Sequence, residues 1–68
     1  MNSNLLKAKL AENGLTQGDA AGEIGVSLSR FNAKINAADG AEFTLGEVRA
    51  LKKLLNLSAD NTDEIFFG

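Results

Sequence analysis

The chain has 68 residues, a formal net charge of −2, and neither Cys, His nor Pro. Its length allows one domain with a single core. The absence of Cys excludes disulfides and zinc fingers, and the absence of His removes the most common general base and the ordinary metal ligands.

The first helix is predicted at about residues 4–12. Leu6 and Leu10 are four residues apart and therefore lie on one side of a helix. The sequence Asn13-Gly14 follows, and glycine adopts the left-handed conformation that ends a helix without a steric penalty. We therefore expect the first helix to end there.

A second helix is predicted over residues 17–24. Thr16 is a favourable N-cap, and Asp19 stands three residues later, as in a capping box. Gly18 and Gly22 weaken this helix by up to about 1 kcal/mol each relative to alanine. Small residues on the inner side imply that another helix approaches closely; the inner residues are Ala20, Ala21 and Ile24.

Gly25 is expected to end the second helix, and Ser27 to cap a third at about residues 28–36. Phe31 and Ile35 are four residues apart, and Leu28 lies three before Phe31. This shared side favours a core position for Leu28 over a surface contact.

A loop is predicted over residues 37–43, where Asp39-Gly40 marks a turn. Thr44 and Glu47 form a capping box that opens a fourth helix, which ends at Leu55 or Asn56. Its expected apolar stripe consists of Leu45, Val48, Leu51, Leu54 and Leu55.

A short last helix is predicted at about residues 62–67, after a polar turn at residues 58–61. The apolar run Ile65-Phe66-Phe67 is also compatible with an extended segment. We expect one phenylalanine ring to close the core and the other to take part in a dimer interface.

The stretch from residue 16 to 36 contains two capped helices joined by Gly25-Val26-Ser27, a spacing that fits a helix-turn-helix. The sequence here resembles the lambda-repressor/Cro-type (XRE) helix-turn-helix family, and the similarity extends from LKAKLAENGLTQ to the final EIFF. The residues that carry the resemblance are Gln17, Ala21, Ile24, Gly25, Val26 and Phe31.

The resemblance implies an all-α, compact bundle of five short helices forming one domain over residues 1–68. It further implies a phage-type transcriptional regulator, a repressor similar to Cro, that binds an operator in double-stranded DNA as a homodimer, with the third helix in the major groove. The residues expected to contact DNA are Gln17, Leu28, Ser29, Arg30, Asn32, Ala33, Lys34 and Asn36.

A second interpretation is a helix-turn-helix fold used as a protein-interaction module, such as an antagonist of another repressor. The net acidity favours it, because cationic contacts to phosphate dominate affinity for DNA. No catalytic constellation is recognisable, so we expect no enzyme activity, cofactor, metal or small-molecule substrate. Neither a membrane-spanning run nor a secretion signal is recognisable, and the expected location is cytoplasmic.

Overall fold

Side-chain caps determine where the helices begin. In the computed structural model, which describes residues 1–68, each α-helix is preceded by a polar side chain that accepts a hydrogen bond from a backbone N–H three residues later. This bond satisfies one of the amide groups that a helix start leaves without a partner. The capping residues are Asn2, Thr16, Ser27, Thr44 and Ser58.

Five α-helices follow from these caps, and the chain contains no strand. The prediction of an all-α fold with five helices is confirmed. The helices are α1 (Ser3–Glu12), α2 (Gln17–Ile24), α3 (Leu28–Ile35), α4 (Leu45–Leu54) and α5 (Ala59–Thr62). Two further turns complete the fold, the 3₁₀ turn η1 (Ala38–Gly40) and the π-helical turn η2 (Asp63–Phe67).

The last helix begins earlier than predicted. Ser58 caps α5, so residues 59–61 form its first turn rather than a polar loop, and η2 continues it to Phe67. Periodicity alone missed this start because the first turn contains only small and polar residues, whereas the cap signal at Ser58 was present in the sequence.

Left-handed residues follow four of the helices. Gly14, Gly25, Ala37 and Asn56 have φ values of 67°, 79°, 53° and 51°. At Gly25 the chain closes α2 with a bond from the N–H of Val26 to the carbonyl of Ala21, 3.0 Å long. This six-to-one bond is the Schellman arrangement, which reverses the chain within three residues and allows α3 to begin at once.

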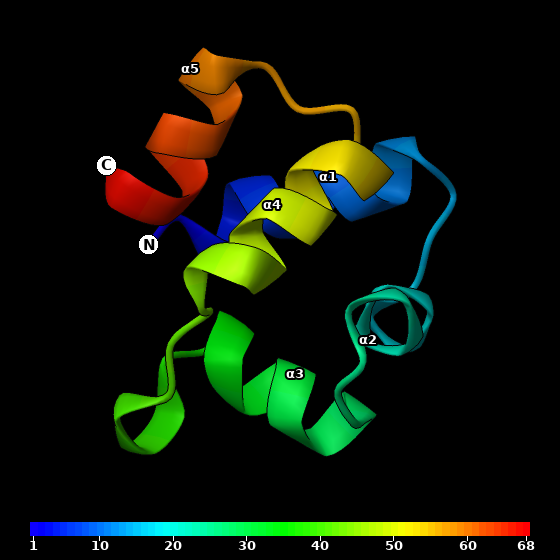
Figure 1. Ribbon diagram of the computed structural model, residues 1–68, viewed down its shortest axis with the longest axis vertical. Helices are drawn as coiled ribbons and strands as arrows, with labels where there is room; N and C mark the ends of the chain where they lie inside the picture. Colours follow the sequence, from blue (N-terminus) through cyan, green and yellow to red (C-terminus); the bar gives the residue numbers. More distant parts are fainter.

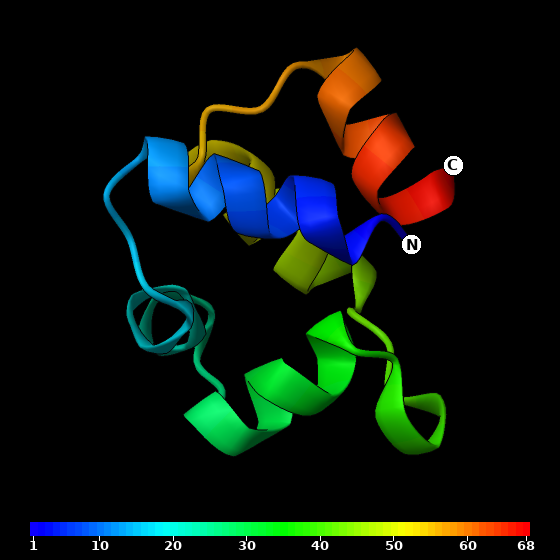
Figure 2. The same cartoon turned by 180° about the vertical axis from the view of Figure 1, so that it is seen from behind.

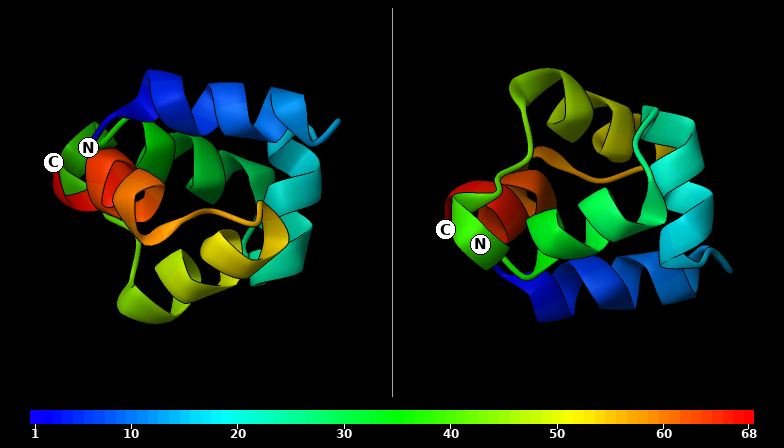
Figure 3. Two further views of the ribbon diagram at one scale, coloured as in Figure 1. Left: turned by 90° about the horizontal axis from the view of Figure 1, so that it is seen from above. Right: turned by 90° about the horizontal axis from the view of Figure 1, so that it is seen from below.

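The helices surround one core. Figures 1 and 2 show α1 and α4 on opposite sides of the molecule, with α3 below them and α5–η2 above. The view from above adds that α2 closes the end opposite the chain termini (Figure 3). Each of these helices contributes at least one buried side chain; the largest are Leu6, Phe31, Ile35, Leu51 and Ile65.

The two ends of the chain meet. The backbone N–H of Asn2 donates to the carbonyl of Ile65 at 2.7 Å, and Figure 1 shows the termini side by side. No helix is long and apolar enough to cross a membrane.

Two expected core positions are wrong. Leu28 is 54% exposed and Leu45 is 60% exposed. Each is the first residue of its helix, so its side chain lies at the helix end. Residues deeper in the same stripes, Phe31, Val48 and Leu51, are buried as expected.

Candidate nucleic-acid interface

The pair α2 and α3 is the feature to which the sequence assigns function. Ala20 and Ala21, in the middle of α2, are almost completely buried, so no large side chain separates the two helices at this point. Figure 1 shows α2 nearly end-on and α3 lengthwise, so the two axes cross at a steep angle. The three-residue turn and the alanine contact together hold α3 on the outside of the molecule.

The outer side of α3 is open to solvent. Ser29, Arg30 and Asn32 are exposed, as is Leu28 in the first turn, and Ala33 is half-buried. A hydroxyl, a guanidinium and a carboxamide are the groups that hydrogen-bond to base edges or phosphate. These expected contact residues therefore lie together on one accessible side of α3, which we call the α3 surface.

Asn36 and Asn32 are linked to each other at the C-terminal end of this surface. The Asn36 side-chain amide donates to the Asn32 Oδ1 at 2.7 Å, and both residues are exposed. Because a carboxamide oxygen accepts two hydrogen bonds, Asn32 keeps both donors and one acceptor site for another molecule.

Lys34 departs from the expectation of a phosphate contact. Only 5% of its surface is exposed, and its Nζ lies 2.6 Å from Glu47 Oε1 at the start of α4. The ammonium therefore joins α3 to α4 instead of pointing to solvent. No local pattern indicated this pairing, because the two residues are in different helices.

Glu47 serves two purposes in this pairing. Its Oε1 also accepts from the backbone N–H of Thr44 at 2.9 Å, which completes the capping box of α4. Burial raises the pKa of the Glu47 carboxyl, but the hydrogen bonds from Lys34 and Thr44 and the charge of Lys34 outweigh burial. The net effect lowers its pKa, so Glu47 is ionised at neutral pH.

Gln17 lies in the first turn of α2 and is half-buried. The Oε1 atom of its carboxamide is buried without a hydrogen-bond partner. Such an atom costs free energy until a partner is found, so Gln17 has unused hydrogen-bonding capacity at the start of α2.

The charge near the α3 surface is small. Since Lys34 is paired, Arg30 is the single exposed cation of α3. Asp39 and Glu42 are exposed in the segment that follows α3 and bring negative charge to its C-terminal side. The remaining cations belong to α1 and α4 and are Lys7, Lys9, Arg49, Lys52 and Lys53.

Comparison of the chain with protein-family models, with curated proteins and with solved structures finds no match. No group of three or more acidic side chains lies close enough together to hold a metal ion. Function must therefore be argued from the α3 surface itself.

Proposed function

We propose that this protein is a sequence-specific DNA-binding regulator that inserts α3 into the major groove and acts by occupying an operator as a homodimer. The observation that carries the proposal is the exposed outer side of α3, which presents Ser29, Arg30 and Asn32 on a helix held outward by α2. An α-helix fits the major groove, where each base pair presents a distinct set of donors and acceptors.

Each residue has a distinct part in this proposal. Arg30 binds guanine or a phosphate, Asn32 matches the donor and acceptor of adenine, and Ser29 bonds to either purine. Leu28 is exposed and apolar, so it contacts a thymine methyl group. Gln17 supplies a phosphate contact from the start of α2 through the NH₂ donors of its carboxamide, at a helix end whose dipole favours an anion.

The experiment is a titration of labelled duplex DNA, including the promoter region of the protein's own gene, by fluorescence anisotropy at several salt concentrations. Affinity should fall linearly with the logarithm of salt, at about 0.9 per phosphate contacted. The slope should be shallow, because Arg30 is the main cation of the α3 surface. Light scattering of the free protein and of the complex should report two copies on a site with half-sites one helical turn apart.

Arg30→Ala and Arg49→Ala form a matched pair of variants. Both remove one exposed arginine, but Arg30 lies on α3 and Arg49 on α4. Arg30→Ala should weaken binding about tenfold or more, whereas Arg49→Ala should leave it nearly unchanged. Equal losses would show that α3 is not the recognition element.

A second function is favoured by one pair of observations. Leu28 is an exposed apolar side chain on the α3 surface, and Lys34 is neutralised by Glu47. A helix that presents leucine with few cations suits a protein partner better than phosphate. Absence of DNA binding at about 50 mM salt would favour this protein-interaction module, such as an antagonist of another repressor.

A further inference from the structure

A line of aromatic rings leads from the core to the surface. The ring centroids of Phe31 and Phe43 are 5.4 Å apart, those of Phe43 and Phe66 5.8 Å, and those of Phe66 and Phe67 6.5 Å. Phe31 is fully buried, whereas Phe67 is 64% exposed. The aromatic surface of the core therefore continues into solvent at the C-terminal end of the molecule.

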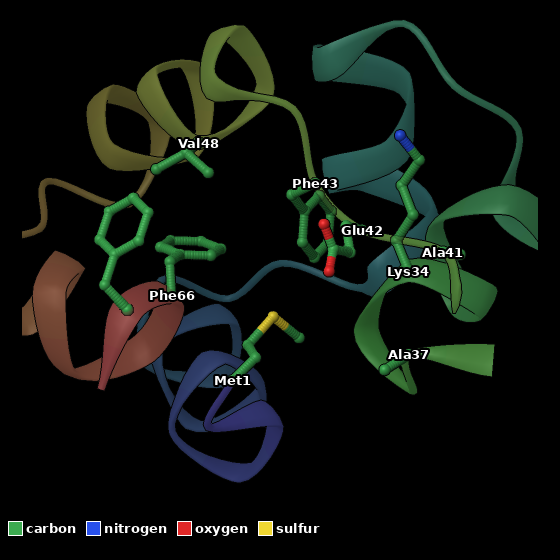
Figure 4. Close-up of a pocket in the computed structure, with 9 residues that line it drawn as sticks. Met1, Lys34, Ala37, Ala41, Glu42, Phe43, Val48 and Phe66 are labelled. Carbon is green, nitrogen blue, oxygen red and sulfur yellow. The ribbon is translucent and has the colours of Figure 1, made fainter. Parts of the chain in front are cut away.

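These rings border an open groove of about 300 Å³, which we call the aromatic groove. Its lining includes Met1, Phe43, Val48, Phe66 and Phe67. Figure 4 shows Met1, Phe43 and Phe66 pointing toward one another across it. The volume accommodates one or two large apolar side chains. Phe66 and Phe67 belong to the π-helical turn η2, a rare conformation that occurs frequently at functional sites.

The charged side chains at the aromatic groove that form no ion pair are acidic. Glu42 lines it, and Glu64 lines the adjoining depression, which shares Met1 with it. The two side chains are exposed and neither forms an ion pair. Lys34 also lines the groove, but its ammonium is bound to Glu47. The N-terminal ammonium of Met1 is the other cation nearby.

We infer that the aromatic groove is a docking site for a protein segment that carries a large apolar side chain next to lysine or arginine. The apolar side chain fills the groove against Phe43 and Phe66 and covers Phe67. The adjacent cations meet Glu42 and Glu64, neither of which forms an ion pair within the chain. A polar rim around an apolar centre is the usual composition of a protein interface.

A second copy of the chain fits this surface poorly. In a two-fold dimer the same patch meets itself, so the carboxylates of Glu42 and Glu64 from both copies would gather at one interface. Like charges in contact disfavour association. The charge pattern therefore selects a basic partner, and it argues against the dimer interface that the sequence suggested for Phe66 and Phe67. The inference does not depend on DNA binding, since none of the exposed residues of the α3 surface lines this groove.

The test uses a short amphipathic helical peptide of leucine and lysine, and the same peptide with glutamate in place of lysine. Binding is followed by calorimetry and by amide NMR shifts. The lysine peptide should bind and shift the amides of Phe43, Phe66 and Phe67, and the glutamate peptide should bind at least about tenfold more weakly. Equal binding of both peptides, or shifts confined to the α3 surface, would overturn the inference.

Two matched pairs of variants sharpen the test. The double variant Glu42→Gln/Glu64→Gln should bind the lysine peptide about threefold to tenfold more weakly. The double variant Glu12→Gln/Glu23→Gln, which changes the net charge equally, should bind it as tightly as the original protein does. The control acids lie at the ends of α1 and α2, and neither lines the groove. Equal losses from the two charge pairs would show that net charge alone attracts the peptide.

Phe67→Ser should weaken peptide binding at least about tenfold, and Leu28→Ser, an equally exposed apolar residue elsewhere, should not. Both side chains are on the surface, so the variants should retain the helical circular dichroism spectrum. If Phe67→Ser instead converted a dimer into a monomer, a second copy would be the occupant and the inference would be wrong.

Discussion

Removing Glu47 from its pair with Lys34 should lower the free energy of unfolding much more than removing the charge of Lys34. Glu47→Ala leaves the Lys34 ammonium, which is 5% exposed, without its counter-charge, and it removes the acceptor of the Thr44 N–H. An unpaired buried charge costs about 3–5 kcal/mol. The long lysine side chain recovers part of that cost by reaching water, so we expect a loss of about 2–3 kcal/mol.

Lys34→Met removes the charge but keeps the apolar stem. Glu47 still accepts from Thr44 and is partly exposed, so its carboxylate remains satisfied. The expected loss is about 0–1 kcal/mol. A domain of this size has a free energy of unfolding of about 3–10 kcal/mol, so the difference between the two variants is a large fraction of the total.

Urea denaturation followed by far-UV circular dichroism measures both variants. With a slope of about 1 kcal/mol per molar urea, Glu47→Ala should lower the midpoint by about 2–3 M and Lys34→Met by less than about 1 M. The double variant should be more stable than Glu47→Ala alone, because no buried charge is left unpaired. If the losses of the single variants simply added, the two side chains would be independent and the argument from burial would be refuted.

Three further outcomes follow from the fold. The pKa values of Glu47 and Asp19 are lowered from the ordinary 4.5 and 3.8, that of Asp19 mainly by the backbone N–H of Thr16. The stability that these two carboxylates contribute is therefore complete above about pH 5 and is lost as pH falls through their folded pKa values. Urea midpoints measured from pH 7 to 3 should decline only below pH 5, and the decline should be less steep for Glu47→Gln. In urea denaturation, Gly25→Ala should lower the free energy of unfolding by about 1–2 kcal/mol, because φ is 79° at this position. Gly22→Ala should raise it by about 0.5–1 kcal/mol, because this residue is in the helix interior and the space for a Cβ is open. Phe31→Ala removes a fully buried ring and should cost about 3–5 kcal/mol, a large part of the stability of the domain, so the thermal midpoint should fall steeply. An unchanged midpoint would contradict the assigned core.

The features that the sequence predicted correctly are local ones. Caps at Thr16, Ser27 and Thr44 depend on a bond between residues three apart, so the residue types alone identify them. The left-handed stop at Gly25 has the same origin. These signals located α2 and the starts of α3 and α4 without any knowledge of the core.

Apart from the missed local cap at Ser58, the errors concern contacts between distant segments. Leu28 satisfies the spacing of an apolar stripe, yet no neighbouring helix covers the end of α3 where it lies, and it stays exposed. Lys34 has the spacing and composition of a surface residue, but Glu47 of α4 draws its ammonium inward. Both outcomes depend on which other segments pack against α3, and helical periodicity carries no information about that packing.

For the candidate site, the sequence located Ser29, Arg30 and Asn32 on an accessible side of α3 because this side is opposite Phe31 and Ile35. The unpartnered oxygen of Gln17 and the pairing of Asn32 with Asn36 depend on side-chain conformations. Charge composition indicated weak electrostatic attraction to DNA, and the pairing of Lys34 reduces that attraction further.

The hydrogen bond from Asn2 to Ile65 makes one amide a reporter of how the chain ends dock. Its proton can exchange with solvent only when α1 and η2 separate, so deuterium uptake at Asn2 measures the opening of that junction. Closing so long a loop is entropically expensive, and the junction is therefore expected to form late during folding. A ligand seated beside Met1 and Phe66 would clamp the same junction and slow the exchange at Asn2, although it never contacts that amide.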